Sequence, residues 1–359
     1  MKQFCQNKKL LIVYQPWRKQ EEGLSYPIKL SLEKYGMQVD MLDICFPPAF
    51  KNNYLPDKLI NIFRRLVFKD SSYYFKAEKR HYQKFYLQKL KTHPRKDYDY
   101  ILVIRPDEYK PYFFKTLTQY GTKMCGYIWD GIHDDWGTDL KNSAKYFQNI
   151  FCFDPYDIEK HKDIQLKFAT NFYIDNLVNR SENLPKYLFS YIGGIGSKDA
   201  NRRDFLIQKN FSDYLQKSEI IIQCDLGYIN PENELHNENL QYQNEYLPYI
   251  QVLEKEKNAE IIIDICKPHH KGLSFRAFES LFFGKKLITN NADVVNYDFY
   301  HPENILIVDF NNPAIEKVKQ FMKLPYHPID ENIVKKYSVE NWIKYILNLE
   351  GNIPITYGK

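Results

Sequence analysis

The sequence predicts an α/β protein made of two Rossmann-like domains, each a doubly wound parallel sheet. Strand-like and helix-like segments alternate with short connections along most of the 359 residues, as they do in parallel sheets. Several strand-like segments are short continuous apolar runs, which are typical of strands covered on both faces. The alternation pauses at a polar seam near 176–185 and then restarts, so we expect domains at 1–183 and 184–334.

The elements of the first half follow from local signals. The apolar run Lys9–Tyr14 has the length of a strand, and Ser25–Tyr35 has a helical pattern with Pro27 in its first turn and Gly36 as its stop. The segment 56–90 has a helical pattern throughout. The other expected strands are 37–44, 98–105, 123–129 and 149–153, and the other expected helices are 111–120, 140–147 and 155–161.

The second half repeats this order. It begins with a strand at 187–192, a glycine loop at 193–197 and a helix at 201–215. A helix at 274–283 is expected to end at Gly284, because glycine is favoured just beyond a helix. The other expected strands are 219–224, 259–266, 286–289 and 304–308, and the other expected helices are 244–254, 313–322 and 339–349.

Composition indicates a packed globular protein of a reducing compartment. Hydrophobic residues make up 44% of the chain, and the six cysteines are far apart, with no C-x-x-C pair. This spacing argues against a zinc ribbon and against a disulfide framework. No apolar stretch approaches the roughly 20 residues of a membrane span, and the start of the chain does not have the pattern of a signal peptide. We therefore expect a cytoplasmic protein.

The segment 58–91 combines basic and aromatic residues. Between Lys51 and Lys96 there are thirteen Lys or Arg against three Asp or Glu. Such a segment fits the inner face of the cytoplasmic membrane, as a peripheral contact with anionic lipid or with a lipid-linked acceptor. A helical hairpin whose aromatic residues form core is an equal alternative. No recognised nucleic-acid motif is present, so we expect no nucleic-acid partner.

The segment 264–279 has the order of an anion site. A buried strand runs into a basic turn, then Gly272, then a helix that opens at about Leu273 and Ser274. Free N–H groups at a helix start attract phosphate. A carboxylate at Glu279 can accept hydrogen bonds from the two hydroxyls of a ribose. In the alternative interpretation, the loop lysines are solvated and Glu279 pairs with an arginine. The expected cations of this site are Lys267, Lys271 and Arg276.

The glycine loop at 193–197 is a second candidate for binding a donor. Gly193 and Gly194 follow a strand, with Ser197 close behind and Arg202 and Arg203 entering the next helix. Glycines in this place let a phosphate approach the backbone. The loop is not a complete G-x-G-x-x-G motif, a plain tight turn explains it equally well, and no P-loop motif is present.

The third candidate follows the expected strand at 123–129. Asp130 and His133 lie where a carboxylate or imidazole can deprotonate an acceptor hydroxyl, and the residues alone do not decide between them. The alternatives are a turn with a side-chain cap and a residue that positions the substrate. Gln15 and Trp17, after the first strand, are expected on the acceptor side. We expect no metal, because lysine and arginine neutralise the phosphates.

Several stretches together resemble the bacterial lipopolysaccharide-core and capsular-polysaccharide glycosyltransferases. They are 127–131, 152–157, 272–279, 284–290, 297–300 and 304–307. The resemblance implies a GT-B fold, a nucleotide-sugar donor in the C-terminal domain, an acceptor in the N-terminal domain, and no metal or other cofactor. It also implies that Glu279 binds ribose or sugar, that Gly272–Ser274 bind the diphosphate, and that a helix within 335–350 packs back on the first domain.

The sequence departs from this family at one position. Retaining enzymes of the fold commonly have two glutamates separated by seven residues, and the earlier position here is Lys271. The resemblance therefore leaves open whether the anomeric configuration is retained or inverted. The predicted function is transfer of a sugar from a nucleotide-sugar to a lipopolysaccharide or capsule acceptor. A nucleotide-sugar isomerase or epimerase, a polyol-phosphate transferase and a non-catalytic sugar-nucleotide binder remain alternatives.

Overall fold

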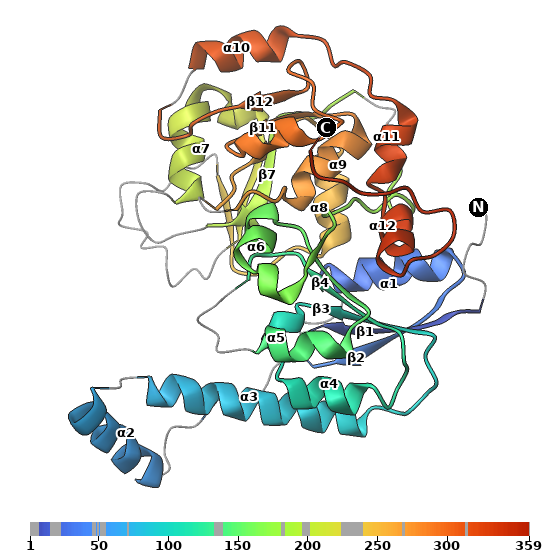
Figure 1. The fold of residues 1–359 in the computed structure, drawn as a ribbon. Helices are drawn as coiled ribbons and strands as arrows, with labels where there is room; N and C mark the ends of the chain where they lie inside the picture. The colour runs from blue at the N-terminus through green and yellow to red at the C-terminus, as the bar shows by residue number, and fades with distance from the viewer. Residues whose placement is uncertain are drawn as a thin grey trace.

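Two parallel sheets form the framework of the protein (Figure 1). The structure is a computed structural model that describes residues 7–14, 23–44, 48, 50, 55–69, 72–132, 139–180, 184–195, 202–223, 240–267, 270–312 and 315–358. Each sheet has six strands, every neighbouring pair of which is parallel. The predicted fold class, two Rossmann-like domains, is confirmed.

Each sheet has one point where the strand order changes direction. The first sheet has the order β2-β1-β3-β4-β5-β6, and the second has the order β12-β11-β10-β7-β8-β9. The loops after β1 and β3, and after β7 and β10, therefore leave in opposite directions and open a crevice. The strands are β1 (Lys9–Tyr14), β2 (Gln38–Asp43), β3 (Tyr100–Ile104), β4 (Met124–Ile128), β5 (Asn149–Cys152), β6 (Lys167–Phe168), β7 (Tyr187–Gly194), β8 (Glu219–Gln223), β9 (Gln241–Gln243), β10 (Ala259–Asp264), β11 (Lys286–Thr289) and β12 (Ile305–Ile307).

Most helices connect successive strands and cover the faces of the sheets (Figure 1). The helix before Gly284 ends as predicted, because Gly284 adopts a left-handed backbone conformation with φ of 62°. Among the described residues, no helix has both the length and the apolar character needed to cross a membrane. The helices are α1 (Ser25–Lys34), α2 (Leu55–Phe68), α3 (Tyr73–Thr92), α4 (Pro111–Leu117), α5 (Leu140–Ser143), α6 (Pro155–Lys160), α7 (Arg203–Phe211), α8 (Tyr249–Glu256), α9 (Phe275–Phe283), α10 (Ile315–Lys323), α11 (Glu331–Lys336) and α12 (Val339–Ile346).

Some predicted elements differ from the structure, and some observed elements were not predicted. The long helix expected over 56–90 is two helices, α2 and α3, and the chain turns at Lys69, whose φ is 52°. Gly193 and Gly194 do not open a loop but finish β7, where they pair with Ile222 and Gln223 of β8. The short strand β9 and the helix α11 were not predicted, because neither has a periodic apolar pattern long enough to recognise.

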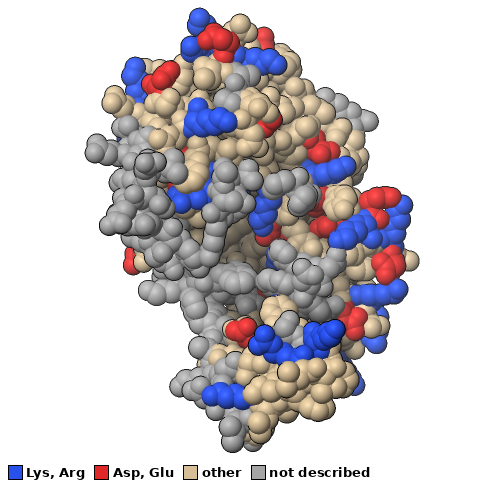
Figure 2. Space-filling view, turned by 90° about the vertical axis from the view of Figure 1, so that its left-hand side faces the viewer, with Lys and Arg blue, Asp and Glu red and all other residues tan. Residues whose placement is uncertain are grey.

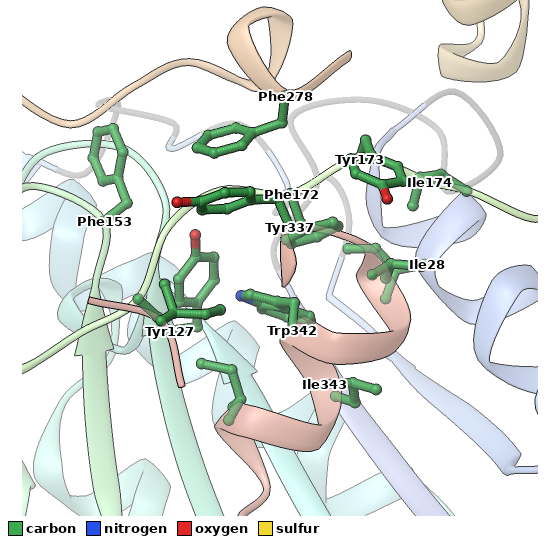
Figure 3. Close-up of a cluster of buried hydrophobic side chains, with 14 of the residues drawn as sticks. Ile28, Tyr127, Phe153, Phe172, Tyr173, Ile174, Phe278, Tyr337, Trp342 and Ile343 are labelled. Atoms are coloured by element: carbon green, nitrogen blue, oxygen red, sulfur yellow. The ribbon is translucent and has the colours of Figure 1, made fainter. Parts of the chain in front are cut away.

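The last helix joins the end of the chain to the first domain. Trp342 of α12 is fully buried, with its ring centroid 4.9 Å from that of Tyr127 and 4.2 Å from that of Phe172. Figure 3 shows these rings in one cluster with Tyr337 and with Phe278 of α9. Side chains from both domains therefore form one continuous core at the junction.

Two backbone segments also meet at this junction. The amide of Tyr173, which follows β6, donates to the carbonyl of Tyr337 at 3.1 Å, and the amide of Val339 donates to the carbonyl of Tyr173 at 2.8 Å. The chain leaves the first domain beyond Tyr173 and returns to it at α12. Its outgoing and returning segments are thus hydrogen-bonded to each other.

Candidate functional site

A cavity of about 540 Å³ lies between the two sheets, at the carboxyl ends of their strands. Its volume is in the range of small-molecule sites, and both crevices predicted by the strand order open into it. Trp129 from the first domain and Phe275 from the second meet there edge to face, with ring centroids 6.0 Å apart. The other residues that line it from the first domain include Tyr14, Asp130, Phe153 and Asn171.

A buried carboxyl pair forms one part of the cavity wall. Glu279 of α9 accepts a hydrogen bond from the phenol of Tyr249. Glu256 of α8 is fully buried beside Glu279, and among the described residues neither of its oxygens accepts a hydrogen bond. Two buried carboxyl groups that interact this closely repel each other when both are ionised, so the neutral form of one of them is favoured. Burial raises the pKa of both groups, so the pair retains a proton at pH values where an exposed glutamate is ionised.

Arg276 supplies positive charge beside this pair. It lies in the first turn of α9, donates to the carbonyl of Ile192, and holds its guanidinium 5.1 Å from the ring of Tyr191. Its nitrogens are 3.7 Å from carboxylate oxygens of Glu256 and of Asp264. Burial disfavours the charged form, but Tyr191 and the carboxyl groups outweigh burial and raise the pKa of Arg276. The guanidinium therefore stays charged at the start of the helix.

Asp264 holds the start of α9 in place. Its carboxylate accepts hydrogen bonds from the hydroxyl of Ser274 at 2.8 Å and from that of Thr289 at 3.2 Å. Asp264 lies at the end of β10 and is 2% exposed. Ser274 directly precedes α9, and Thr289 is the last residue of β11. The positions of Ser274 and Arg276 relative to the sheet are thus determined by a buried hydrogen-bond network.

Asp130 faces the second domain across the cavity. Lys267 donates to both of its carboxylate oxygens at 3.1 Å, and Nδ1 of His270 is 3.7 Å from one of them. Arg105, at the end of β3, approaches the other to 3.9 Å. Burial disfavours ionisation of Asp130, but Lys267, Arg105 and His270 outweigh burial and lower its pKa. Asp130 is therefore a carboxylate at neutral pH.

The segment predicted to bind the diphosphate divides into two parts. The amides of Lys271 and Gly272 point to the carboxylate of Asp154 in the first domain, with 3.2 Å between the Lys271 nitrogen and Oδ2. The carbonyl of Leu273 accepts from the side-chain amide of Asn171 at 2.9 Å. These three residues therefore join the domains. Gly272 also lines the cavity, as do Ser274, Phe275 and Arg276 at the start of α9, whereas Leu273 does not.

Only some of the other residues predicted to bind the nucleotide-sugar line the cavity. Gly193 and Gly194 line the cavity, whereas Arg202 turns away from it and forms an ion pair with Asp204. The neighbouring Arg203 lines the cavity instead and donates to the carbonyl of Gly194 at 3.2 Å. Lys267 lines both this cavity and a second one of about 420 Å³, and Lys271 lines only the second. Gln15, Trp17, His133 and Ser197 lie outside the described residues.

Sequence reasoning missed several residues in or near the cavity, among them Tyr249, Glu256, His270 and Asp154. Tyr249 and Glu256 are seven positions apart, which places both on one face of a helix, but glutamate and tyrosine at that spacing are common on solvated helices. His270 lies in the connection between β10 and α9, where nothing in the local sequence marks it as a neighbour of Asp130. Asp154 caps the start of α6, where it accepts from the amide of Tyr156 at 2.9 Å. Only the packing of the two domains reveals the second contact of Asp154.

A cluster of possible metal ligands lies apart from this cavity. Among the described residues, His301, Glu303 and His327 bring three donor atoms within 4.8 Å of one another. The rings of His301 and His327 stack 3.9 Å apart with an angle of 9° between their planes. A metal ion lies in the plane of each imidazole that binds it, so two parallel rings do not converge on one ion in this arrangement.

Comparison with known proteins supports the fold assignment. No protein-family model and no curated protein sequence matches this chain. The structure is similar to that of HepE from Anabaena in complex with UDP and glucose, with a TM-score of 0.54 and 9% identity over 95% of this chain and 99% of that chain. It is also similar to an alpha-glucosyltransferase in complex with UDP-glucose and DNA containing an abasic site, with a TM-score of 0.52, 12% identity and 96% of each chain covered.

The predicted GT-B fold is thereby confirmed. Identities of 9% and 12% show the fold alone, because one fold supports many activities and specificity depends on the residues of the site. The resemblance to lipopolysaccharide-core and capsular enzymes stays a prediction.

Proposed function

We propose that this protein is a glycosyltransferase that transfers a sugar from a nucleotide-sugar to a surface-glycan acceptor. The observation that carries the proposal is the cavity between the sheets, where a buried carboxyl pair and a cationic helix start lie opposite a carboxylate of the other domain. These three features correspond to three groups of the reactants. The groups are the nucleoside, the diphosphate of the leaving nucleotide and the acceptor hydroxyl.

Glu279 is the proposed ribose ligand. Its carboxylate lines the cavity, is held there by the hydrogen bond from Tyr249, and has further lone pairs that can accept from hydroxyl groups. Gln223 is a candidate for reading the base, because its side-chain nitrogen is buried and has no hydrogen-bond partner among the described residues. Both solved structures compared above contain UDP or UDP-glucose, which makes a UDP-sugar the first donor to test.

The start of α9 is the proposed diphosphate site. Free amides at Ser274 and Phe275, together with the helix dipole, attract an anion, and Arg276 adds a full positive charge. Arg203 and Lys267 line the same cavity and bring two further cations. These groups stabilise the negative charge that develops on the leaving nucleotide, so the proposed reaction needs no metal and no other cofactor.

Asp130 is the proposed proton acceptor on the acceptor side. It comes from the first domain, is ionised, and lies in the wall opposite the start of α9. A carboxylate in that position can remove a proton from an acceptor hydroxyl as the sugar is transferred. His133, the other candidate base, remains part of the proposal. The proposed acceptor is a lipopolysaccharide or capsule precursor at the inner face of the cytoplasmic membrane.

A thermal-shift screen tests the donor site. UDP, GDP, CMP, dTDP and ADP and their sugars are compared with and without EDTA, using wild type, Glu279→Gln and the exposed Glu260→Gln as a matched control. One nucleotide should raise the melting temperature of wild type and Glu260→Gln but not that of Glu279→Gln, without an effect of EDTA. A nucleotide site is contradicted if millimolar nucleotide leaves the wild-type melting temperature unchanged.

Acceptor dependence separates transfer from the alternative activities. A transferase releases the nucleotide at a rate that rises with the concentration of acceptor. Conversion of the nucleotide-sugar to an isomer without any acceptor would instead identify an isomerase or epimerase. Transfer of a polyol phosphate would leave a different product, which mass spectrometry of the acceptor distinguishes.

A further inference from the structure

Helix α2 presents its apolar face to solvent. Leu59, Ile62, Phe63, Leu66 and Val67 lie on one side of the helix, and each is between 53% and 77% exposed. A surface helix normally turns such a stripe toward the core and its polar residues toward water. An exposed apolar face of this kind is typical of an interaction surface.

The polar side of α2 faces the protein. Asn61 is buried, and Asp57 accepts a hydrogen bond from the hydroxyl of Tyr73 in α3 at 2.6 Å. The guanidinium of Arg64 lies 6.0 Å from the ring centroid of the same tyrosine. These contacts hold the helix with its apolar residues outward.

The helix also projects from the body of the protein. Figure 1 shows α2 beyond the N-terminal end of α3, at the end of the molecule that lies farthest from the second sheet. In Figure 2 this end of the molecule presents a broad uncharged surface bordered by Lys and Arg. By contrast, α3 buries Tyr73, Ala77, Tyr86 and Leu90 against the protein. The segment 58–91 is therefore part core hairpin and part exposed apolar surface, and α2 is the exposed part.

Basic residues flank the apolar face. Lys58, Arg64, Arg65 and Lys69 lie on or beside α2, against a single acidic residue in the helix, Asp57. The basic character continues in α3, where Lys79 lies 5.0 Å from the ring of the half-exposed Phe75. An apolar stripe bordered by lysine and arginine is complementary to a bilayer whose headgroups are negative.

We propose that α2 lies in the surface of an anionic phospholipid bilayer, with Leu59, Ile62, Phe63, Leu66 and Val67 among the acyl chains. The basic residues beside them would then contact lipid phosphates. A second copy of the chain is a poorer occupant, since pairing two α2 helices brings their positive charges together. The proposal does not depend on the sugar-transfer activity, because none of these residues lines the cavity between the sheets.

Vesicle flotation of the full chain tests this surface. Neutral phosphatidylcholine vesicles are compared with equimolar phosphatidylcholine and phosphatidylglycerol vesicles. Wild type should float with the anionic vesicles at least about tenfold more than Leu66→Glu, and added salt should weaken its binding. Leu184→Glu is the matched control, because Leu184 is 88% exposed, lies outside α2, and undergoes the same change of size and charge. It should float as wild type does.

A second variant leaves the apolar face intact. Arg65→Glu reverses one exposed charge and should reduce flotation with anionic vesicles. This variant still tests the surface if Leu66→Glu fails to fold. The nucleotide-dependent thermal shift should persist in both variants, so loss of vesicle binding and loss of the donor site are distinguishable.

Three outcomes would overturn the proposal. The first is wild type that fails to float with anionic vesicles. The second is equal flotation of Leu66→Glu and Leu184→Glu. The third is a wild-type dimer in sedimentation velocity that Leu66→Glu dissociates while vesicles bind neither form, which would assign the apolar face to self-association.

Discussion

Lys267 donates hydrogen bonds to both carboxylate oxygens of Asp130, at 3.1 Å each, and so connects the two domains across the cavity. The side chains are 50% and 39% exposed, and an ion pair this accessible contributes at most about 1 kcal/mol. A phosphate group entering the cavity can therefore compete for Lys267. The same event would release Asp130 for an acceptor hydroxyl.

Asp130→Asn should abolish transfer without weakening donor binding. An asparagine keeps the shape of the side chain but cannot accept the acceptor proton, so kcat should fall by about 100-fold or more. The dissociation constant of the nucleotide should stay the same or decrease, since Lys267 loses its carboxylate partner. Steady-state kinetics and calorimetric titration measure the two quantities separately.

The control for this variant is Asp163→Asn, which removes an exposed carboxylate paired with Lys141 at 3.0 Å. It should leave both quantities unchanged. Full activity in Asp130→Asn would mean that Asp130 only joins the domains.

Gly193→Ala should weaken nucleotide binding, whereas Gly194→Ala should not. A methyl group at Gly193 would lie 2.5 Å from Nη2 of Arg276, so the guanidinium would have to leave its place at the start of α9. At Gly194 the nearest atom, the carbonyl oxygen of Gln223, is 3.7 Å away, an ordinary contact. A loss of affinity of about tenfold or more in Gly193→Ala alone is expected in calorimetric titration. Equal affinities of the two variants for the nucleotide would mean that Arg276 does not contribute to nucleotide binding.

Gly272→Ala should destabilise the junction of the domains. A methyl group there would lie 2.5 Å from Cδ2 and 2.6 Å from the carbonyl oxygen of Phe153, and the backbone oxygen has little freedom to move. Inserting a methyl group into so tight a contact costs about 1–3 kcal/mol. Scanning calorimetry should show a lower melting temperature than in wild type and in Gly194→Ala. A variant as stable as wild type would mean that the two domains separate here without cost.

Glu108→Gln should make stability less dependent on pH. Burial raises the pKa of Glu108 to about 8, only partly opposed by Arg105. Because the folded state keeps a proton that the unfolded state releases above its ordinary pKa of about 4.5, the stability of wild type declines as pH rises toward 8, by at most about 1.4 kcal/mol per pH unit from this group. Glutamine cannot titrate, so this part of the decline disappears.

Denaturant unfolding between pH 5 and pH 8 measures the effect of Glu108. The difference between Glu108→Gln and wild type should grow in favour of the variant as pH rises. Glu260→Gln, at an exposed position of β10, should follow wild type. A pH-independent difference would show that Glu108 is ionised in the folded protein.

The fold was predictable because its signals are local. Nearly every strand of the sheets is a short apolar run such as Lys9–Tyr14, and the predicted bounds of β1, β7, β8, β10 and β11 are within two residues of the observed ones. Burial on both faces makes such runs continuous, which is why they stand out in the sequence. The break between α2 and α3 was missed because the helical pattern continues on both sides of it.

The site was less predictable because its decisive contacts join elements that are separate in the sequence. Glu279, Arg276 and Ser274 could be selected from one stretch of sequence, and all three line the cavity. The pairing of Glu279 with Glu256 could not, because it depends on how α8 and α9 pack together. Similarly, the amides of Lys271 and Gly272 looked free for phosphate until Asp154, more than a hundred residues earlier, was placed beside them.

The hydrogen bonds of Tyr173 with Tyr337 and Val339 hold the two chain segments that pass between the domains side by side. Two connecting segments that lie side by side leave one line about which the domains can rotate. Connecting segments far apart would restrict such a rotation. A rotation about that line would have to break the contacts that join the domains across the cavity, among them the exposed ion pair of Asp130 and Lys267. For the proposed transferase, opening of the cavity would thus separate Asp130 from Lys267, while the buried contacts of Trp342 with Tyr127 stay in place.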